Sequence, residues 1–420
     1  MKPFQGVAVL SLAICVLAST PSRSSQAKSG AVDPGVRGGP PGAGGPLPGL
    51  TADETVFFQD GQSRFGEIET VQGDSNDGLG PRFNSNQCLS CHSQPNGGGS
   101  SPAQNPLISV ATLDGAKDTV PWFIAPNGPV RETRFKKSNG VPDGNVHALF
   151  VITGRQDAAG CNIRQFDFLP AGNPLTGQGG NANIIFRIPT PLFGTGLIEA
   201  IPDSAILANL QANATLKASL GISGHPSAID ETPSCIFTAT PNNVLNFTTP
   251  ATSATSNPAV ISDIEGFANF MRMLAPPTPA PDTPTIANGR ATFIKIGCAH
   301  CHTPSLTTGK MIASGSATVP SAALSNQTVH LFSDLLVHHM GKGLADGITQ
   351  GAAGPDEFRT APLWGVGQRI FFLHDGRTSN LVEAIRAHKS RGSEANRVIH
   401  QFNKVSTEEQ QGIIDFLRAL

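Results

Sequence analysis

Two stretches of the chain place hydrophobic residues with the period of an amphipathic helix. In residues 262–274, SDIEGFANFMRML, one helical stripe holds Ile264, Phe267, Met271 and Leu274. In residues 406–420, STEEQQGIIDFLRAL, the corresponding stripe holds Ile413, Phe416, Leu417 and Leu420. Both stretches open with Ser-x-x-Glu, a capping box, and both end with Phe-x-Arg-x-Leu. The pattern predicts two similar helices that each bury one face.

A second pair of matching segments precedes these helices. Residues 186–196, FRIPTPLFGTG, and residues 358–367, FRTAPLWGVG, share Phe-Arg followed by Pro-Leu-aromatic-Gly-x-Gly. Because the landmarks recur in the same order, we interpret the chain as an internal duplication. Two unrelated amphipathic helices would explain less of the pattern.

The first repeat is longer than the second. Residues 145–154, 161–169 and 181–189 are β-branched and aromatic runs interrupted by Gly, Asn and Pro, which predicts strands. The expected fold class is therefore mainly α, with two helical domains and a strand-and-loop insertion in the first. The proline-rich connector 274–284 suggests domains at 51–275 and 276–420.

Composition narrows the choice of partners. Charged residues make up 14% of the chain, and it has 46 glycines, 34 prolines and a formal net charge of −2. Since phosphate binding depends on clustered cations and the chain has no run of Lys or Arg, we expect no nucleic-acid partner.

The amino terminus has the layout of a secretory signal. Lys2 precedes an apolar run from Val7 to Ala18, followed by small residues. We expect a signal peptide at 1–27, with cleavage after Ala27 or nearer Ser19, and then a Pro/Gly-rich linker at 28–50. The mature protein is expected to be periplasmic or secreted, without a membrane span.

Two C-x-x-C-H motifs give the main chemical signal. The first contains Cys88, Cys91 and His92. The second contains Cys298, Cys301 and His302. Two cysteines three apart can both reach one porphyrin, and the following histidine then presents its imidazole to the iron, so we predict two covalently attached haem c groups. Zinc is disfavoured because neither motif has a second ligand pair nearby. Cys15 belongs to the predicted signal peptide, and the remaining Cys161 and Cys235 form either a disulfide or two buried thiols.

With these motifs in place, the chain resembles the bacterial dihaem cytochrome c peroxidase and MauG superfamily, most of all the branch labelled thiol oxidoreductase-like. The resemblance lies in FNSNQCLSCHSQPNGGGSSP, PLFGTGLIEAIPD, GCAHCHTPSLTTG, EFRTAPLWGVG and FFLHDGRTSNLVEAI. It implies two cytochrome-c-like domains with one haem each and electrons passing between them. A calcium ion between the domains is a further feature of relatives that the sequence leaves open.

The resemblance also suggests the second iron ligand of the second haem. In the peroxidases an axial Met follows the HDG element by fourteen residues, and here the residue fourteen after His374 is His388. We therefore expect ligation by His302 and His388, with Met340, beside His338 and His339, as the alternative. Because imidazole is a stronger donor than thioether, this pair should lower the reduction potential. The chain contains no Tyr, which excludes a tyrosine ligand.

The first haem departs from the family pattern, since nothing between His92 and Ala275 matches the peroxide-cleaving Phe-Trp-Asp-Gly-Arg element. We expect an open iron face there, with Glu199 as a candidate distal acid that moves a proton. A helix-cap or surface role for Glu199 is the alternative. His147 and His225 are the other histidines of this half that could close the site.

The sequence thus predicts an exported dihaem c-type oxidoreductase with a peroxidase-like reaction at the first haem. An electron-transfer dihaem cytochrome without a substrate site is the alternative. Expected partners are a small cytochrome or cupredoxin and a small oxidant such as peroxide. Trp122 and Trp364 are candidates for electron hopping, with core packing as the other explanation.

Overall fold

The computed structural model describes residues 30–73, 76–109, 123–138, 141–142, 149–160, 183–226, 263–310 and 320–420. The predicted signal peptide, Trp122, His147, Cys161 and Cys235 lie outside these ranges. The described helices are α1 Ala52–Gly66, α3 Thr195–Glu199, α4 Asp203–Gln211, α5 Ala214–Leu220, α6 Asp263–Met273, α7 Pro284–Lys295, α8 Leu381–Ala387, α9 Asn396–Lys404 and α10 Thr407–Ala419. Every helix in this described part is too short or too polar to cross a lipid bilayer.

The described strands are short and pair antiparallel in twos. The pairs are β1 Glu132–Phe135 with β4 Ile184–Arg187, β2 Lys137–Ser138 with β3 Val141–Pro142, β5 Leu306–Thr307 with β6 Thr328–Val329, and β7 Val337–His339 with β8 Glu357–Arg359. Strand β4 lies within the predicted run 181–189, but the run 161–169 is outside the described residues. The described part of 145–154 contributes only the bridge between Arg134 and Leu149. About one-third of the structure is helical, so the expected mainly α, cytochrome-c-like fold is not confirmed.

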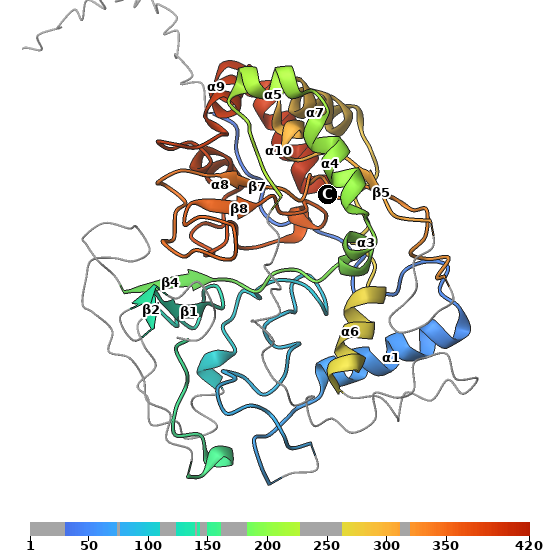
Figure 1. The fold of residues 1–420 in the computed structure, drawn as a ribbon, viewed down its shortest axis with the longest axis vertical. Coiled ribbons are helices and arrows are strands. Elements are labelled where there is room, and N and C mark those ends of the chain that lie inside the picture. Colours follow the sequence, from blue (N-terminus) through green and yellow to red (C-terminus); the bar gives the residue numbers. More distant parts are fainter. Residues whose placement is uncertain are drawn as a thin grey trace, which may run out of the picture.

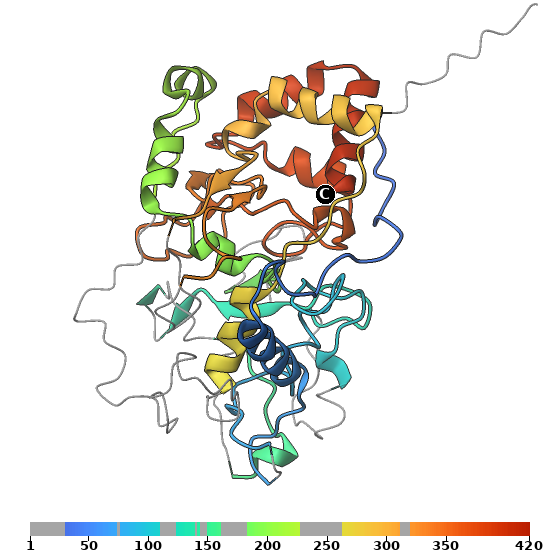
Figure 2. The ribbon, with the colours of Figure 1, turned by 90° about the vertical axis from the view of Figure 1, so that its right-hand side faces the viewer.

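Two crossed helix pairs lie in different halves of the molecule. Helices α1 and α6 pack together in the lower half of the view, and α7 and α10 in the upper half (Figure 1), as the turned view also shows (Figure 2). Each pair crosses at glycines. A Cβ on Gly61 would lie 2.1 Å from the carbonyl oxygen of Gly266, and a Cβ on Gly289 would lie 1.8 Å from that of Gly412. Only glycine allows this backbone contact, so both crossings depend on the same residue type.

The two Pro-Leu-aromatic-Gly-x-Gly loops take matching conformations. Gly194 and Gly365 both have positive φ, at 66° and 70°. The N–H of Gly194 donates to the carbonyl of Leu274 at 2.9 Å, and the N–H of Gly365 donates to that of Leu420 at 3.0 Å. Each loop therefore holds the carboxyl end of the helix in its own half, which agrees with the duplication predicted from the sequence. The domain boundaries themselves stay a prediction.

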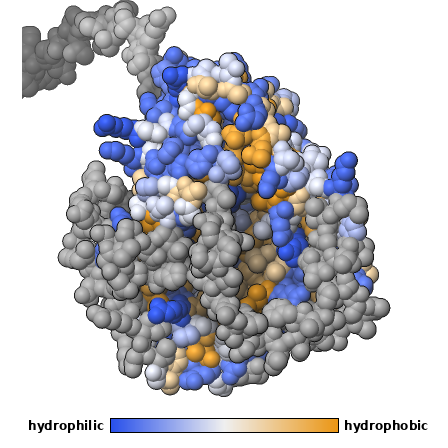
Figure 3. Space-filling view, viewed as in Figure 1, coloured by the Kyte–Doolittle hydropathy of each residue, from blue (hydrophilic) through white to orange (hydrophobic). Residues whose placement is uncertain are grey.

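Hydrophobic side chains gather in three clusters. One surrounds α1 and α6, a second surrounds α7 to α10, and a third fills the space around β1 and β4. Trp364 is buried in the first cluster although it belongs to the second half, because its ring packs over Gly194. On the face shown in Figure 3, apolar residues lie in a hollow at mid-height.

The predicted helical stripes are only partly correct. Helix α10 buries Ile413, Phe416 and Leu417, and its capping box joins Ser406 to Glu409 as expected. In α6, however, Ile264 is 55% exposed, which contradicts its predicted place in the core. The close approach of Gly266 to α1 sets the buried face of α6 instead, with Phe270 and Met273 fully enclosed.

Residues 30–50, predicted to be a linker, pack along both halves. Asp33 pairs with Arg418 at 2.7 Å, and the N–H of Leu47 donates to the carbonyl of Met273 at 2.8 Å. Leu47 is buried in the cluster around α1 and α6. The Pro/Gly-rich composition indicated a flexible spacer because it lacks periodicity, but backbone hydrogen bonds hold this segment in an extended path.

Candidate functional site

The second C-x-x-C-H motif forms a tight turn at the end of α7. Gly297 has a φ of 100°, which lets the chain leave the helix, and Cys298–His300 then form a single 3-10 turn. The N–H of His302 donates to the carbonyl of Cys298 at 2.9 Å. The turn thus brings the two cysteines and the histidine together, as haem attachment requires.

His302 and His388 present the same kind of imidazole. His302 donates its Nδ1 proton to the carbonyl of Phe332 at 3.0 Å, and His388 donates its own to the carbonyl of Ala384 at 2.8 Å. A carbonyl only accepts, so each ring carries its proton on Nδ1 and offers Nε2 as a lone pair. Burial, together with the nearby charge of His388, lowers the pKa of His302 to about 4, and burial lowers the pKa of His388. Both rings are therefore neutral at pH 7, the form that binds a metal.

The first motif repeats this turn. The N–H of His92 donates to the carbonyl of Cys88 at 3.2 Å, and its Nδ1 donates to the carbonyl of Gly99 at 3.0 Å. The glycine-rich run after the motif makes this bond possible, since a Cβ on Gly99 would lie 2.0 Å from the carbonyl oxygen of Gln94. The ring of His92 lies 6.1 Å from that of Phe65, and the ring of His302 lies 6.2 Å from that of Phe293.

The cysteines of both motifs fit covalent attachment of a haem. Burial raises the pKa of Cys91 to about 11 and that of Cys298 to about 12. Thiols with such pKa values stay protonated at pH 7, which disfavours nucleophilic redox chemistry, because that chemistry needs the thiolate. Two thiols and an imidazole in this order are the donor set that a c-type haem takes.

The two motifs differ in what surrounds the histidine. His388 lies close enough to His302 to shift its pKa, whereas no other histidine in the described part of the chain is paired with His92 in this way. His225 does not close the first site, because its ring contacts Glu357 on β8. His147 is outside the described residues, so the sixth position at the first motif stays a prediction.

Glu199 is held in an ion pair. Its carboxylate accepts hydrogen bonds from Nε and Nη2 of Arg272 at 2.8 and 3.0 Å, and its side chain is 58% exposed. The Arg272 hydrogen bond outweighs partial burial and lowers the pKa of Glu199. The carboxylate is therefore charged at neutral pH, which suits a surface pair better than a proton donor. The distal-acid assignment stays a prediction without support from this geometry.

Glu69 is a carboxyl near the first motif that the sequence reasoning missed. Partial burial, then the charges of Asp263 and Glu67, raise the pKa of Glu69. Burial first, and then the charge of Glu69, raises the pKa of Cys88, which places Glu69 near that thiol. No motif contains Glu69, and only its proximity to Cys88 in the folded chain indicates a role.

A buried ionic network adjoins the second motif. His338, on β7, contacts Asp334 at 3.0 Å and Glu394 at 2.8 Å, and its Nδ1 lies 3.7 Å from Sγ of Cys301. Burial alone would lower the pKa of His338, but the bonds to its neighbours, Asp334 first, raise it to about 12. His338 is therefore a buried cation rather than an iron ligand. Met340 follows on the same strand, and its N–H donates to the carbonyl of Asp356.

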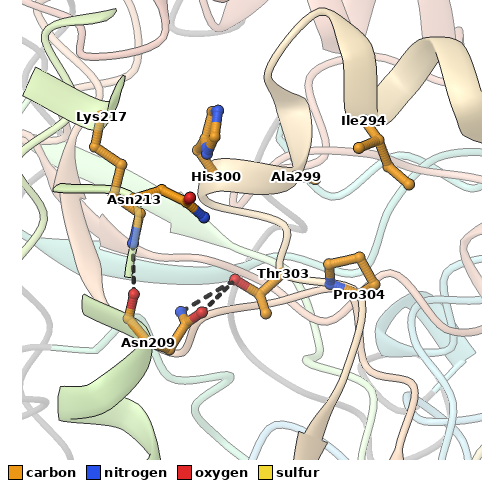
Figure 4. A pocket seen from close by; sticks show the side chains of 8 residues that line it. All are labelled: Asn209, Asn213, Lys217, Ile294, Ala299, His300, Thr303 and Pro304. Carbon is orange, nitrogen blue, oxygen red and sulfur yellow. Dashed lines mark hydrogen bonds between the residues drawn. The ribbon is translucent and has the colours of Figure 1, made fainter. Parts of the chain in front are cut away.

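A cavity of about 240 Å³ lies beside the second motif. Its lining residues are Asn209, Asn213, Lys217, Ile294, Ala299, His300, Thr303 and Pro304 (Figure 4). The ammonium of Lys217 donates to the carbonyl of Asn209 at 2.6 Å, and the amide of Asn209 donates to the hydroxyl of Thr303 at 3.1 Å. Since Thr303 follows His302, helices α4 and α5 of the first half brace the loop of the second motif.

The HDG element connects the two halves. The ring of His374 stacks on that of Phe358 with 4.5 Å between centroids, and burial lowers its pKa to about 4. Its carbonyl accepts from the N–H of Ile188, and Arg131 donates to the carbonyl of Asp375. His374 is thus a neutral packing residue at the contact between the insertion and the second half.

Residues 251–420 match a family model described as "Di-haem oxidoreductase, putative peroxidase". The match covers the second motif, His374 and His388, and it supports the dihaem part of the expected resemblance. It gives no support to the MauG branch. Search of the curated proteins finds no match.

One solved structure similar to this chain is Kuenenia stuttgartiensis hydrazine synthase, determined under xenon pressure. The sequences are 20% identical, and the TM-score is 0.24. The alignment covers 38% of this chain and 55% of that one, so this chain spans about half the length of the structure that it matches. At this TM-score the likeness carries no inference about fold or function.

Proposed function

We propose that the chain is an exported dihaem c-type oxidoreductase in which the second motif serves electron transfer and the first is the site of reaction with a peroxide-like oxidant. The observation that carries the proposal is that His388 lies near enough to His302 to influence its pKa while both rings are held in the same way. Both rings are neutral, both have Nδ1 fixed by a carbonyl, and both offer Nε2. The family match over residues 251–420 supports the same class of protein.

The residues that would hold the cofactors are Cys88, Cys91 and His92 at the first motif and Cys298, Cys301, His302 and His388 at the second. When bound, haem supplies one-electron chemistry and, where an iron position stays open, reduction of a small oxidant. The role of the protein chain is to fix the iron ligands, to exclude water and to move protons.

At the second motif, two histidine ligands would leave no iron position for a substrate. At the first motif, Glu69 is a better candidate than Glu199 for supplying a proton. Glu69 has a raised pKa and lies near Cys88, whereas Glu199 is held ionised by Arg272. A proton donor works best when its pKa lies near the working pH, so the direction of the shift favours Glu69. Which carboxyl group donates the proton at the first motif is a separate question from whether His388 binds the iron at the second.

Electrons would be exchanged with a small soluble carrier such as a cytochrome or a cupredoxin. Helices α4 and α5 and the cavity beside Thr303 lie next to the second motif. We therefore place the binding of the electron carrier on this face of the protein. A calcium ion between the halves is not part of the proposal, because no described contact points to one.

The test compares the spin states of the two haems in the wild-type protein and in His388→Ala. We expect one low-spin and one high-spin ferric signal in the wild type, with the high-spin signal changing when peroxide is added. In His388→Ala the low-spin signal should be lost, whereas in a control variant of the exposed His400 on α9 it should remain.

Two low-spin signals that ignore peroxide, in both the oxidised and the half-reduced protein, would instead establish an electron-transfer cytochrome without a substrate site. A low-spin signal that survives His388→Ala would contradict the ligand assignment alone. The first outcome would reject the proposed reaction with peroxide, and the second would reject only His388 as an iron ligand.

A further inference from the structure

Arg369 lies where the segment after the second Gly-x-Gly loop meets the first half of the chain. It directly follows the 3-10 turn Val366–Gln368. Its carbonyl accepts a hydrogen bond from Nη1 of Arg418 at 3.2 Å. The carbonyl at the end of the turn accepts from Nε2 of Gln94, two residues after His92, at 2.9 Å. The backbone that carries the Arg369 side chain is therefore held from both halves.

The guanidinium of Arg369 has no counter-ion in the described part of the chain. Its Nε is buried and makes no hydrogen bond. Arg418, which binds the same stretch of backbone, pairs by contrast with Asp33 at 2.7 Å. Burial lowers the pKa of Arg369 to about 10, and among the described residues no acid raises it again. The side chain is still charged at pH 7, and a cation largely withdrawn from water needs an anion beside it.

The segment that carries Arg369 belongs to the surroundings of both motifs. Trp364 is buried in the hydrophobic cluster against which Cys88 packs. Phe372 is buried in the cluster against which Cys298 packs. Because Arg369 lies between these two aromatic residues in the sequence, its side chain projects from a segment that borders the attachment sites of both expected haems.

The chemistry of haem c supplies an anion that suits this guanidinium. The cysteines use the vinyl groups of the porphyrin, and the propionates on its periphery are carboxylates that are ionised at neutral pH. A buried carboxylate needs a cation as much as a buried guanidinium needs an anion. Arginine binds a carboxylate through parallel N–H···O bonds, and Nε beside one Nη offers the geometry for such a pair. The unpartnered Nε of Arg369 is therefore a donor of the required kind.

We propose that the guanidinium of Arg369 binds a propionate of a haem held by one of the two motifs. The inference rests on the proposed binding of haem c, because the propionate is part of that cofactor. Arg369 is then a positioning residue that fixes the periphery of the porphyrin, whereas the cysteines fix its vinyl groups. It also places a positive charge near the iron, and such a charge favours the ferrous state over the more positive ferric state.

The test is a redox titration of the haem-loaded protein, in which absorption and electron paramagnetic resonance follow the low-spin and the high-spin iron separately. Arg369→Gln removes the charge and should lower the midpoint potential of one haem while the other keeps its value. The signal that shifts identifies the haem that Arg369 holds. Arg369→Lys keeps the charge without the parallel hydrogen bonds and should restore most of the potential. Arg391→Gln removes an exposed arginine and should shift neither haem, since solvent screens its charge.

Resonance Raman spectroscopy of the same samples reports on the propionate itself. The bending vibration of the propionate should shift in Arg369→Gln, because the carboxylate loses its hydrogen bonds. The vibration should also shift in Arg369→Lys, since one ammonium replaces the parallel bonds of the guanidinium. If Arg369→Gln fails to fold, which circular dichroism would reveal, the charge-preserving lysine variant carries the test through this vibration.

Unchanged potentials and an unchanged propionate vibration in the Arg369 variants would overturn this inference and leave the proposed function intact, because haem content and spin state are measured independently. Equal shifts in Arg369→Gln and Arg391→Gln would also overturn it, since they would show that net charge rather than contact with a propionate sets the potential. A protein that carries no covalent haem, as measured by the pyridine haemochrome spectrum, would overturn the inference and the proposed function together.

Discussion

The two halves of the molecule share a frame but differ in the groups around their C-x-x-C-H motifs. Each has a glycine-to-glycine helix crossing, a phenylalanine about 6 Å from the motif histidine and a Gly-x-Gly loop that holds the helix end. Around the second motif, however, lie His388 and the buried cation His338, whose Nδ1 is 3.7 Å from Sγ of Cys301. In the first motif the neighbour of Cys91 is the neutral Ser90, with its hydroxyl at 3.8 Å from Sγ.

The comparison separates the contacts that hold the backbone of each half in place from the groups that set charge and iron ligation. Backbone contacts at glycines and carbonyl bonds to Nδ1 are the same in both halves, because they serve to hold a turn and orient a ring. The groups that set charge and ligation differ. A duplicated frame can therefore support two different tasks without a change in its architecture.

The largest expected effect comes from removing one pair of motif cysteines. Replacing Cys298 and Cys301 by Ala should leave one covalent haem per chain, and so should replacing Cys88 and Cys91, because thioether bonds hold each haem independently. The pyridine haemochrome spectrum measures the haem content. A wild-type protein with one haem, or variants that retain two, would show that one of the motifs has another role.

The next effect concerns the cation at the second motif. His338→Ala leaves Asp334 and Glu394 buried without their shared cation, and we expect the free energy of unfolding to fall by about 3–5 kcal/mol. The matched change at the first motif, Ser90→Ala, removes a neutral hydroxyl and should cost about 1 kcal/mol. Guanidinium unfolding followed by circular dichroism measures both. Equal losses in the two variants would mean that the charge difference between the motifs has no energetic weight.

A third pair of variants tests whether the frames are equivalent. Gly289→Ala and Gly61→Ala each push a methyl group against a carbonyl of the crossing helix, so we expect losses of about 3 kcal/mol in both. Gly38→Ala serves as the control, because a Cβ at Gly38 meets nothing within 4 Å. If one crossing tolerates Ala and the other does not, the two helix pairs are less alike than their backbones indicate.

The sequence predicted the features that depend on nearby residues and missed those that depend on distant ones. The capping box of Ser406 and the turn of each motif follow from spacings of three or four residues, whereas ligation of one iron by His302 and His388, which came from a family resemblance, stays a prediction. The contact of His338 with Glu394 joins residues 56 apart, and that of Asp33 with Arg418 joins residues 385 apart. The register of β1 on β4 was likewise hidden, since the four-residue run ETRF carries no strand signal by itself.

The smallest effect concerns the arginines at corresponding positions of the two terminal helices, Arg272 and Arg418. Arg418 pairs with Asp33, and their side chains are 5% and 3% exposed, whereas Arg272 pairs with Glu199, which is 58% exposed. Asp33→Asn should lower the free energy of unfolding by about 2 kcal/mol, because Arg418 keeps its bonds to the carbonyls of Gly367 and Arg369. Glu199→Gln should cost less than about 1 kcal/mol, since solvent screens an exposed pair.

The pH dependence separates the charge of Asp33 from its packing. Burial would raise the pKa of Asp33, but the Arg418 bond and two backbone N–H groups outweigh it and lower the pKa below its ordinary value of 3.8. A lowered pKa in the folded state stabilises the protein above that ordinary value, and this stabilisation is lost as the pH falls through the folded-state pKa. The difference between wild type and Asp33→Asn should therefore be constant near neutral pH and shrink below about pH 4. A difference that persists in acid would show that the hydrogen-bond geometry of Asp33, rather than its charge, holds residues 30–50 against the second half.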